Sequence, residues 1–194
     1  MIALSENFDA ALAWVCRRHA RQWRHNTATP YVSHLMATCA IVLEEGGDER
    51  LAIAALLHDV LEDTDTSRTE LRERFGEDVY RVVDDCTDAD AGQRAHLGWT
   101  QRKRAHLDRM AGFDDGSLLV VAADKVSSVQ SLVDDLIRFG PAMFDRSAVP
   151  PVDLLRNYRS VYAVVRPGLG DRPVVRRLEA LIEQFSDALP AACS

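Results

Sequence analysis

The chain has 194 residues, a length that favours one domain with a sizeable core. Hydrophobic residues make up 47%, and no apolar run approaches the roughly 18 residues that cross a bilayer, so we expect no membrane partner. The formal net charge of −7 argues against nonspecific nucleic-acid binding, which depends on Lys and Arg neutralising phosphates.

Nearly every segment has the apolar spacing of an α-helix, and alternating strand patterns are absent. The first helix is predicted from residue 6 to about 24. A second begins at Pro30 and ends at Gly46-Gly47. A third, capped by Asp48, is apolar on nearly all sides from Leu51 to Leu61, which is typical of a central, buried helix. The residues expected to face inward in the first two helices are Phe8, Leu12, Val15, Cys16, Val32, Leu35, Met36, Cys39 and Leu43.

The later helices are predicted from caps and breakers. Ser67 and Glu70 have capping-box spacing for a short helix that ends near Gly76. Residues 88–98 are expected to form a surface loop, and Ser117 to Phe139 a long helix. The other predicted helices are 77–87, 99–110, 151–165 and 173–189, with Pro167-Gly168 separating the last two. The sequence predicts one all-α helical bundle over residues 1–194.

Four ionisable residues interrupt the third helix where it is otherwise most apolar. The stretch AALLHDVLEDT, residues 54–64, places His58-Asp59 and Glu62-Asp63 among leucines and valines. A buried carboxylate is costly unless it is paired or binds a metal. In a continuous helix His58 and Glu62 lie on one face, and so do Asp59 and Asp63. The segment therefore predicts a metal site and hydrolytic chemistry.

Two other helices carry isolated residues of the kinds that bind metals. Asp124 follows seven uncharged residues in the long helix, and His34 lies in the first turn of the second. With His58 and Asp59 they make a set of two imidazoles and two carboxylates, which suits Mn²⁺, Fe²⁺, Co²⁺ or Zn²⁺ better than Ca²⁺. Each residue alone also has a plainer explanation, because His34 fits an ordinary core histidine and Asp124 an ion pair with Lys125. The metal site is favoured because HDxxED lies inside an apolar helix.

The order His34, His58-Asp59, Asp124 resembles that of the HD superfamily of metal-dependent phosphohydrolases. The segments QWRHNTATPYVSHL, AALLHDVLEDT, FGEDVYRVVDDCTD, WTQRKRAHL and LLVVAADK are similar to the hydrolase domain of RelA/SpoT-type proteins and to stand-alone small alarmone hydrolases. The similarity covers roughly residues 6–165. It implies a free-standing, all-α HD domain that removes the 3′-pyrophosphate from (p)ppGpp, usually with Mn²⁺.

The resemblance also implies roles for individual residues. Glu62 and Asp63 match the acidic pair that orients or deprotonates the attacking water, a general-base role that a carboxylate beside a metal can perform. The matched metal ligands are His34, His58, Asp59 and Asp124. The residues that match or lie near substrate-binding positions are Arg24, His25, Lys103, Ser128 and Tyr158.

Two departures from the family pattern affect substrate binding. His25 stands where the family commonly has Lys, and an imidazole is only partly charged near neutral pH. Ser127-Ser128 replaces His-Asn, and Ser128 offers one hydroxyl in place of an amide on the same helix face as Asp124. The substrate therefore stays open between (p)ppGpp and another phosphorylated nucleotide. A non-catalytic nucleotide-binding protein is a third alternative, which the Glu62-Asp63 pair argues against.

Compartment and assembly follow from weaker features. The first residues, MIALSENFDAALAW, lack the basic start of a signal peptide. The cysteines are far apart and form no CxxC, so we expect reduced thiols in a cytoplasmic protein. The expected partner is a small phosphorylated nucleotide, and a homo-oligomer is left open. The cysteines are Cys16, Cys39, Cys86 and Cys193.

Overall fold

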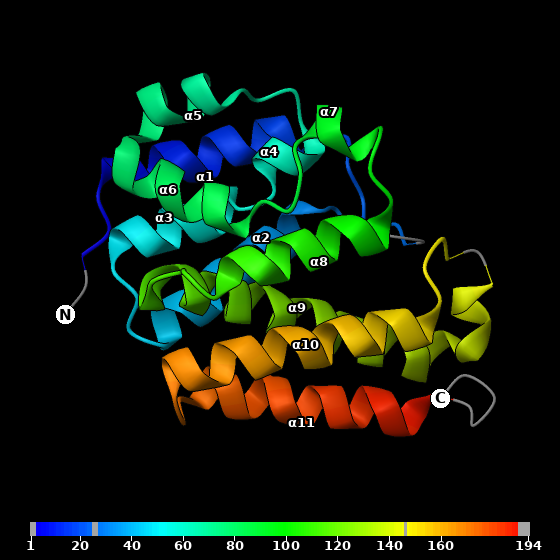
Figure 1. Cartoon of the computed structure of the whole chain (residues 1–194). Helices are drawn as coiled ribbons and strands as arrows, with labels where there is room; N and C mark the ends of the chain where they lie inside the picture. Colours follow the sequence, from blue (N-terminus) through cyan, green and yellow to red (C-terminus); the bar gives the residue numbers. More distant parts are fainter. Residues whose placement is uncertain (1–2, 25–26, 146, 190–194) are drawn as a thin grey trace.

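The computed structural model describes residues 3–24, 27–145 and 147–189, which fold mainly into α-helices (Figure 1). Among these residues the only β-type pairing is an isolated antiparallel bridge between Trp23 and Pro30. The predicted all-α fold is confirmed. The elements are α1 (Glu6–Arg18), α2 (Val32–Glu44), α3 (Glu49–Leu57), α4 (Val60–Asp63), α5 (Arg68–Phe75), α6 (Glu77–Cys86), α7 (Ala91–Arg94), α8 (Trp99–Met110), α9 (Asp115–Phe139), the 3₁₀ helix η1 (Pro141–Phe144), α10 (Pro151–Leu169) and α11 (Pro173–Ala188).

Side-chain caps set several helix starts. Asp48 Oδ1 accepts a hydrogen bond from the Leu51 amide at 2.9 Å, and Ser67 Oγ accepts one from the Glu70 amide at 3.1 Å. Each bond satisfies a donor that the first turn of a helix leaves unpaired. The starts of α3 and α5 therefore agree with the sequence prediction.

The segment between α1 and α2 differs from the prediction. The first helix ends at Arg18 and the second starts at Val32, so residues 19–24 and Pro30 are not helical. The Arg24 amide donates to the Thr29 carbonyl at 2.9 Å, and the Tyr31 amide donates to the Gln22 carbonyl at 2.9 Å. These bonds pair the segment after α1 with the segment before α2, and they replace the hydrogen bonds that a longer helix would have formed.

The prediction of one continuous third helix is wrong, because the structure has two helices, α3 and α4, in its place. The regular structure stops at Leu57 and resumes at Val60, and the intervening Asp59 has φ −100° and ψ 0°, at the edge of the right-handed helical region. The turn aims the Asp59 carboxylate at the Tyr31 hydroxyl, which donates to Oδ2 at 2.5 Å. His58 consequently lies in the turn between α3 and α4, and Glu62 lies in α4.

Two other boundaries also need correction. The segment 88–98 contains α7, whose N-cap Asp90 forms a capping box with Gln93. The helix α10 continues through Pro167 to Leu169 and ends at Gly170, which has φ +65°. Pro167 lies in the last turn, so the hydrogen bond that its missing amide removes is at the end of the helix and interrupts no later turn.

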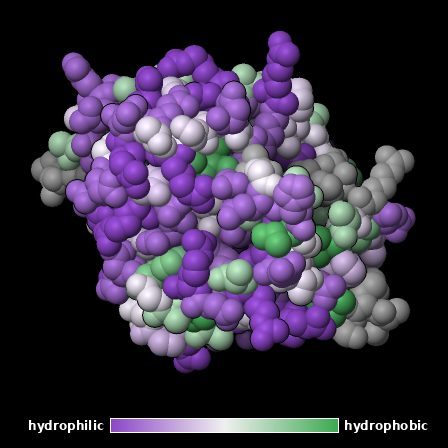
Figure 2. Space-filling view, turned by 45° about the horizontal axis from the view of Figure 1, so that its top comes forward, coloured by the Kyte–Doolittle hydropathy of each residue, from purple (hydrophilic) through white to green (hydrophobic). Residues whose placement is uncertain are grey.

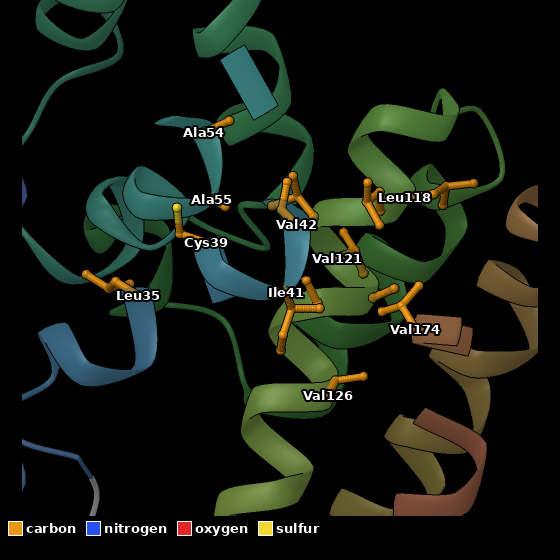
Figure 3. Close-up of a cluster of buried hydrophobic side chains, with 14 of the residues drawn as sticks. Leu35, Cys39, Ile41, Val42, Ala54, Ala55, Leu118, Val121, Val126 and Val174 are labelled. Carbon is orange, nitrogen blue, oxygen red and sulfur yellow. The ribbon is translucent and has the colours of Figure 1, made fainter. Parts of the chain in front are cut away.

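The long helix α9 is the centre of the bundle, and it packs against α2, α3, α6, α10 and α11. Figure 3 shows Ile41 and Val42 of α2 beside Val121 of α9, with Val174 of α11 on the other side. The face shown in Figure 2 is mainly hydrophilic, with small separate apolar spots. Within the described residues no helix is both long and apolar enough to cross a bilayer. The single-domain assignment stays a prediction.

Candidate metal centre

The four residues predicted to bind a metal converge at one point. His34 comes from α2, His58 and Asp59 from the α3–α4 turn, and Asp124 from α9. His34 Nε2 lies 3.2 Å from Asp124 Oδ1, and His58 Nε2 lies 3.1 Å from Asp59 Oδ2. The crossed distances, His34 Nε2 to Asp59 Oδ2 and His58 Nε2 to Asp124 Oδ1, are both 3.7 Å. Ligand atoms of His34, His58 and Asp59 lie within 4.8 Å of one another.

Both imidazoles are oriented by bonds on the side away from the carboxylates. His58 Nδ1 donates to the Ala55 carbonyl at 2.8 Å, and His34 Nδ1 lies 2.9 Å from Ser127 Oγ. The bond to the Ala55 carbonyl requires a proton on His58 Nδ1 and leaves the Nε2 lone pair for a metal, and the Ser127 hydroxyl orients the His34 ring. His58 Nε2 is buried and has no hydrogen-bond partner among the described residues. A buried nitrogen without a hydrogen-bond partner that faces two carboxylates fits a metal ligand.

The charges also suit a cation. Burial lowers the pKa of His34, which favours the neutral form that binds metals. Burial opposes a charge on Asp59 and on Asp124, but a positive charge on His58 lowers the pKa of Asp59, and the Lys125 ammonium, 2.5 Å from Asp124 Oδ2, lowers that of Asp124. The two carboxylates therefore stay ionised at neutral pH. A mixed set of imidazole nitrogens and carboxylate oxygens fits a divalent transition metal.

The Glu62-Asp63 pair lies beside this set and lines the same cavity. Glu62 Oε1 accepts a bond from the Asp88 amide at 2.7 Å, and Glu62 Oε2 lies 3.0 Å from Arg94 Nη1. Asp63 Oδ1 accepts from the same Arg94 nitrogen at 2.8 Å, and Gln22 Nε2 donates to Oδ2 at 2.8 Å. Burial raises the pKa of Glu62 to about 7.

The cavity has a volume of about 220 Å³, and three predicted substrate residues border it. Lys103 Nζ lies 2.6 Å from Asp88 Oδ2, so its charge is partly balanced within the protein. Ser128 Oγ donates to Asp124 Oδ1 at 3.1 Å. Burial raises the pKa of Tyr158 to about 12, so its hydroxyl is neutral and can donate.

Arg24 lies away from the metal cavity, on the wall of an adjoining, mainly apolar cavity of about 410 Å³. The two cavities share Ser128, Leu154 and Tyr158. Arg24 also lines a further cavity together with the predicted ligand His34. The predicted substrate residue His25 lies outside the described residues.

Three contacts of this centre were not predicted from the sequence. They are the hydrogen bond of the Tyr31 hydroxyl to Asp59, the orientation of His34 by Ser127, and the bridging of Glu62 and Asp63 by Arg94. Tyr31 offered a weak signal, because it stands three residues before His34. Ser127 drew notice only as a departure from the family pattern, and Arg94 lay in a segment predicted to be a loop.

Comparison with known proteins decides the family. The HD domain model matches residues 11–137, which is more than half of the chain. The chain belongs to the HD domain family. It is 34% identical over 125 residues to human guanosine-3′,5′-bis(diphosphate) 3′-pyrophosphohydrolase MESH1, covering 63% of this chain and 67% of that protein. An Aquifex aeolicus guanosine-3′,5′-bis(diphosphate) 3′-pyrophosphohydrolase is 41% identical over 128 residues, covering 66% of this chain but 18% of that longer protein.

Solved structures agree with the family. A metazoan orthologue of SpoT, described as hydrolysing ppGpp, matches with a TM-score of 0.76 and 26% identity over 95% of this chain and 98% of that one. A Listeria monocytogenes protein matches with a TM-score of 0.71 at 20% identity, over 79% and 99% of the two chains, which shows the fold alone. The resemblance to RelA/SpoT-type hydrolases is confirmed. HD membership implies a divalent metal, and His34, His58 and Asp59 could bind one.

Proposed function

We propose that the protein is a metal-dependent hydrolase that removes the 3′-pyrophosphate from guanosine polyphosphates such as ppGpp. The observation that carries the proposal is the convergence of two imidazoles and two carboxylates beside the Glu62-Asp63 pair. This arrangement occurs in a chain about one third identical to proteins named as ppGpp 3′-pyrophosphohydrolases. Relatives and site chemistry therefore support the same reaction.

The metal ligands in this proposal are His34, His58, Asp59 and Asp124, and Mn²⁺ is the proposed ion. Zn²⁺, Fe²⁺ and Co²⁺ fit the same nitrogen and oxygen set. A divalent ion polarises a phosphoryl oxygen and makes water more acidic, which are the two requirements of phosphoester hydrolysis. We also propose that residues 1–194 form one domain that works in the cytoplasm.

Glu62 and Asp63 act on the attacking water. A general base works best when its pKa lies near the working pH, and burial places that of Glu62 at about 7. The water oxygen attacks the 3′ phosphorus while the bond between that phosphorus and the ribose 3′ oxygen breaks. The water proton passes to the carboxylate, which returns it to the departing 3′ oxygen, so that the ribose regains its 3′ hydroxyl. The products from ppGpp are GDP and pyrophosphate.

The nucleotide extends from the metal cavity into the adjoining apolar cavity. Lys103 contacts the anionic phosphates, whereas Tyr158 and Ser128 lie where the two cavities join and contact the nucleotide there. Arg24, on the wall of the apolar cavity, and His25 complete the proposed set of substrate contacts. Such a division is typical of ligand sites, where apolar walls bury a base and a few polar groups orient it.

A product-resolved assay tests the proposal. The protein is stripped of metal, reloaded with Mn²⁺ and incubated with ppGpp and a panel of other nucleotides, and the products are separated by anion exchange. Asp59→Ala removes a ligand, and Asp153→Ala removes a carboxylate on α10 that pairs with Arg156 and lines neither cavity. We expect GDP and pyrophosphate from the wild type and Asp153→Ala but not from Asp59→Ala. Intact ppGpp after incubation with saturating Mn²⁺ contradicts the proposal.

A second candidate is hydrolysis of a different phosphorylated nucleotide by the same centre. It is favoured by one observation, because the Ser128 hydroxyl is bonded to Asp124 where a longer amide would extend toward the substrate. In that case the wild type releases phosphate or pyrophosphate from another member of the panel. The double variant His25→Lys, Ser128→Asn then gains activity on ppGpp, and the absence of any gain counts against this candidate.

A further inference from the structure

Arg94 joins the two carboxylates of the acidic pair. A single nitrogen, Nη1, lies 3.0 Å from Glu62 Oε2 and 2.8 Å from Asp63 Oδ1. The second oxygens are held separately, Glu62 Oε1 by the Asp88 amide and Asp63 Oδ2 by Gln22. Arg94 is thus the contact that the two carboxylates share, and it balances charges that would otherwise repel each other.

Arg94 lies on α7, a helix that depends on its neighbours for stability. The helix α7 has four residues, and a helix that short is not stable in isolation. It lies against α4 in Figure 1, and its N-cap Asp90 is tied to α5. Arg68 Nη1 donates to Asp90 Oδ2 at 2.6 Å, while Arg68 Nε donates to Asp84 Oδ1 on α6 at 2.8 Å. Arg68 therefore fixes the start of α7 to two longer helices.

We propose that Arg94 is a positioning residue, which holds Glu62 and Asp63 in the geometry needed to act on water, and that Asp90 and Arg68 hold Arg94 in turn. The proposal rests on the proposed function, because it gives the acidic pair its role. Among the described residues, Arg94 is the cation in ion-pair contact with both Glu62 and Asp63, although the charge of Lys103 also acts on Glu62. Lys103 is engaged with Asp88 at 2.6 Å, and Arg68 with Asp84 and Asp90.

Positioning of the acidic pair by Arg94 can be distinguished from direct binding of substrate by Arg94. Its guanidinium makes two short contacts with protein carboxylates, and 34% of its side chain is exposed at the cavity edge. A residue that positions the base affects the chemical step, so its loss lowers kcat. A residue that binds substrate uniformly raises KM instead. The positioning role therefore predicts a lower kcat with little change in KM, and a substrate-binding role predicts a higher KM with little change in kcat.

The kinetic test compares Arg94→Ala, Arg94→Lys and Asp90→Ala with Arg156→Ala, a control that removes an arginine from the ion pair with Asp153. We expect kcat to fall about 10–100-fold in Arg94→Ala with KM within about threefold of wild type. Lysine restores part of the rate, and so does added methylguanidinium in Arg94→Ala. The double variant Asp90→Ala, Arg94→Ala is no slower than Arg94→Ala, because Asp90 acts through Arg94. A raised KM at unchanged kcat overturns the proposal.

Hydrogen exchange provides a readout that does not depend on the substrate. The Asp88 amide donates to Glu62 Oε1, so its exchange rate reports whether Glu62 stays in place. We expect faster exchange at Asp88 in Arg94→Ala and Asp90→Ala and an unchanged rate in Arg156→Ala. Unchanged exchange in Arg94→Ala overturns the proposal. If the wild type leaves guanosine polyphosphates intact, the proposed function fails while the exchange rates still decide the role of Arg94.

Discussion

Replacing Ser127 with alanine tests whether the outer hydrogen bond of His34 tunes the metal centre. The hydroxyl oxygen lies 2.9 Å from His34 Nδ1, on the side of the ring opposite the proposed metal. His34 is only 4% exposed, so water has little access to replace the lost partner. The variant leaves a buried ring nitrogen without its bond and frees the imidazole to rotate.

The expected loss follows from the behaviour of such outer contacts in metal sites. Removing one typically weakens metal affinity about 10–100-fold, which equals about 1.4–2.7 kcal/mol. An unpaired buried polar group costs about 1–3 kcal/mol, a range that agrees with that figure. We therefore expect the Kd for Mn²⁺ to rise by about one to two orders of magnitude in Ser127→Ala, with the fold unchanged.

Calorimetric titration of the metal-free protein with Mn²⁺ measures this Kd. Ser127→Thr keeps the hydroxyl and is expected to bind within about threefold of wild type. Ser131→Ala removes a hydroxyl one helical turn further along α9 and serves as the matched control. If Ser127→Ala binds Mn²⁺ as tightly as Ser131→Ala does, the orienting role of Ser127 is refuted.

Three further variants probe the fold. Burial lowers the pKa of His106 from 6.5 to about 4, so between these pH values the unfolded chain binds more protons than the folded protein. The free energy of unfolding should therefore fall by up to about 3 kcal/mol as the pH drops from 6.5 to 4. Urea titrations of the His106→Gln variant should lack this decline. Leu57→Ala empties a fully buried position and should cost about 2–5 kcal/mol, seen as a lower Tm; an unchanged Tm contradicts the packing described here. Gly168→Ala should destabilise by about 1–3 kcal/mol despite alanine's helix propensity, because its Cβ would collide with Leu118 Cδ1; a raised Tm would show that Leu118 moves away freely.

The helices could be predicted because apolar spacing records which side of each helix is buried. The apolar residues of α11 recur at helical spacing, which predicts one buried face, and all six are buried: Val174, Val175, Leu178, Leu181, Ile182 and Phe185. Two inward predictions, Cys16 and Met36, were wrong, and both side chains are exposed. Each lies next to a buried residue, Val15 and Leu35, and adjacent positions on a helix point about 100° apart. The α1 face is instead completed by Trp14, which packs against Phe75.

The turn at His58-Asp59 could not be predicted from periodicity. Its apolar neighbours continue the helical pattern on both sides, so nothing local marks the break. The backbone there depends on a partner from another helix, because the Tyr31 hydroxyl holds the Asp59 carboxylate. Arg94 is similar, because its contacts with Glu62 and Asp63 join residues more than thirty positions apart. Ionisable residues in an apolar run predict that a site exists, whereas their orientation depends on tertiary partners.

The two serines after Lys125 have a different meaning in the structure than in the sequence. As departures from the family pattern, they suggest a loss of substrate contacts. In the structure Ser127 contacts His34 and Ser128 contacts Asp124, so both hydroxyls are engaged with proposed metal ligands. A side chain bonded to a ligand has less freedom to discriminate between nucleotides. Discrimination must then depend more on the walls that the two cavities share, where Leu154 and Tyr158 lie.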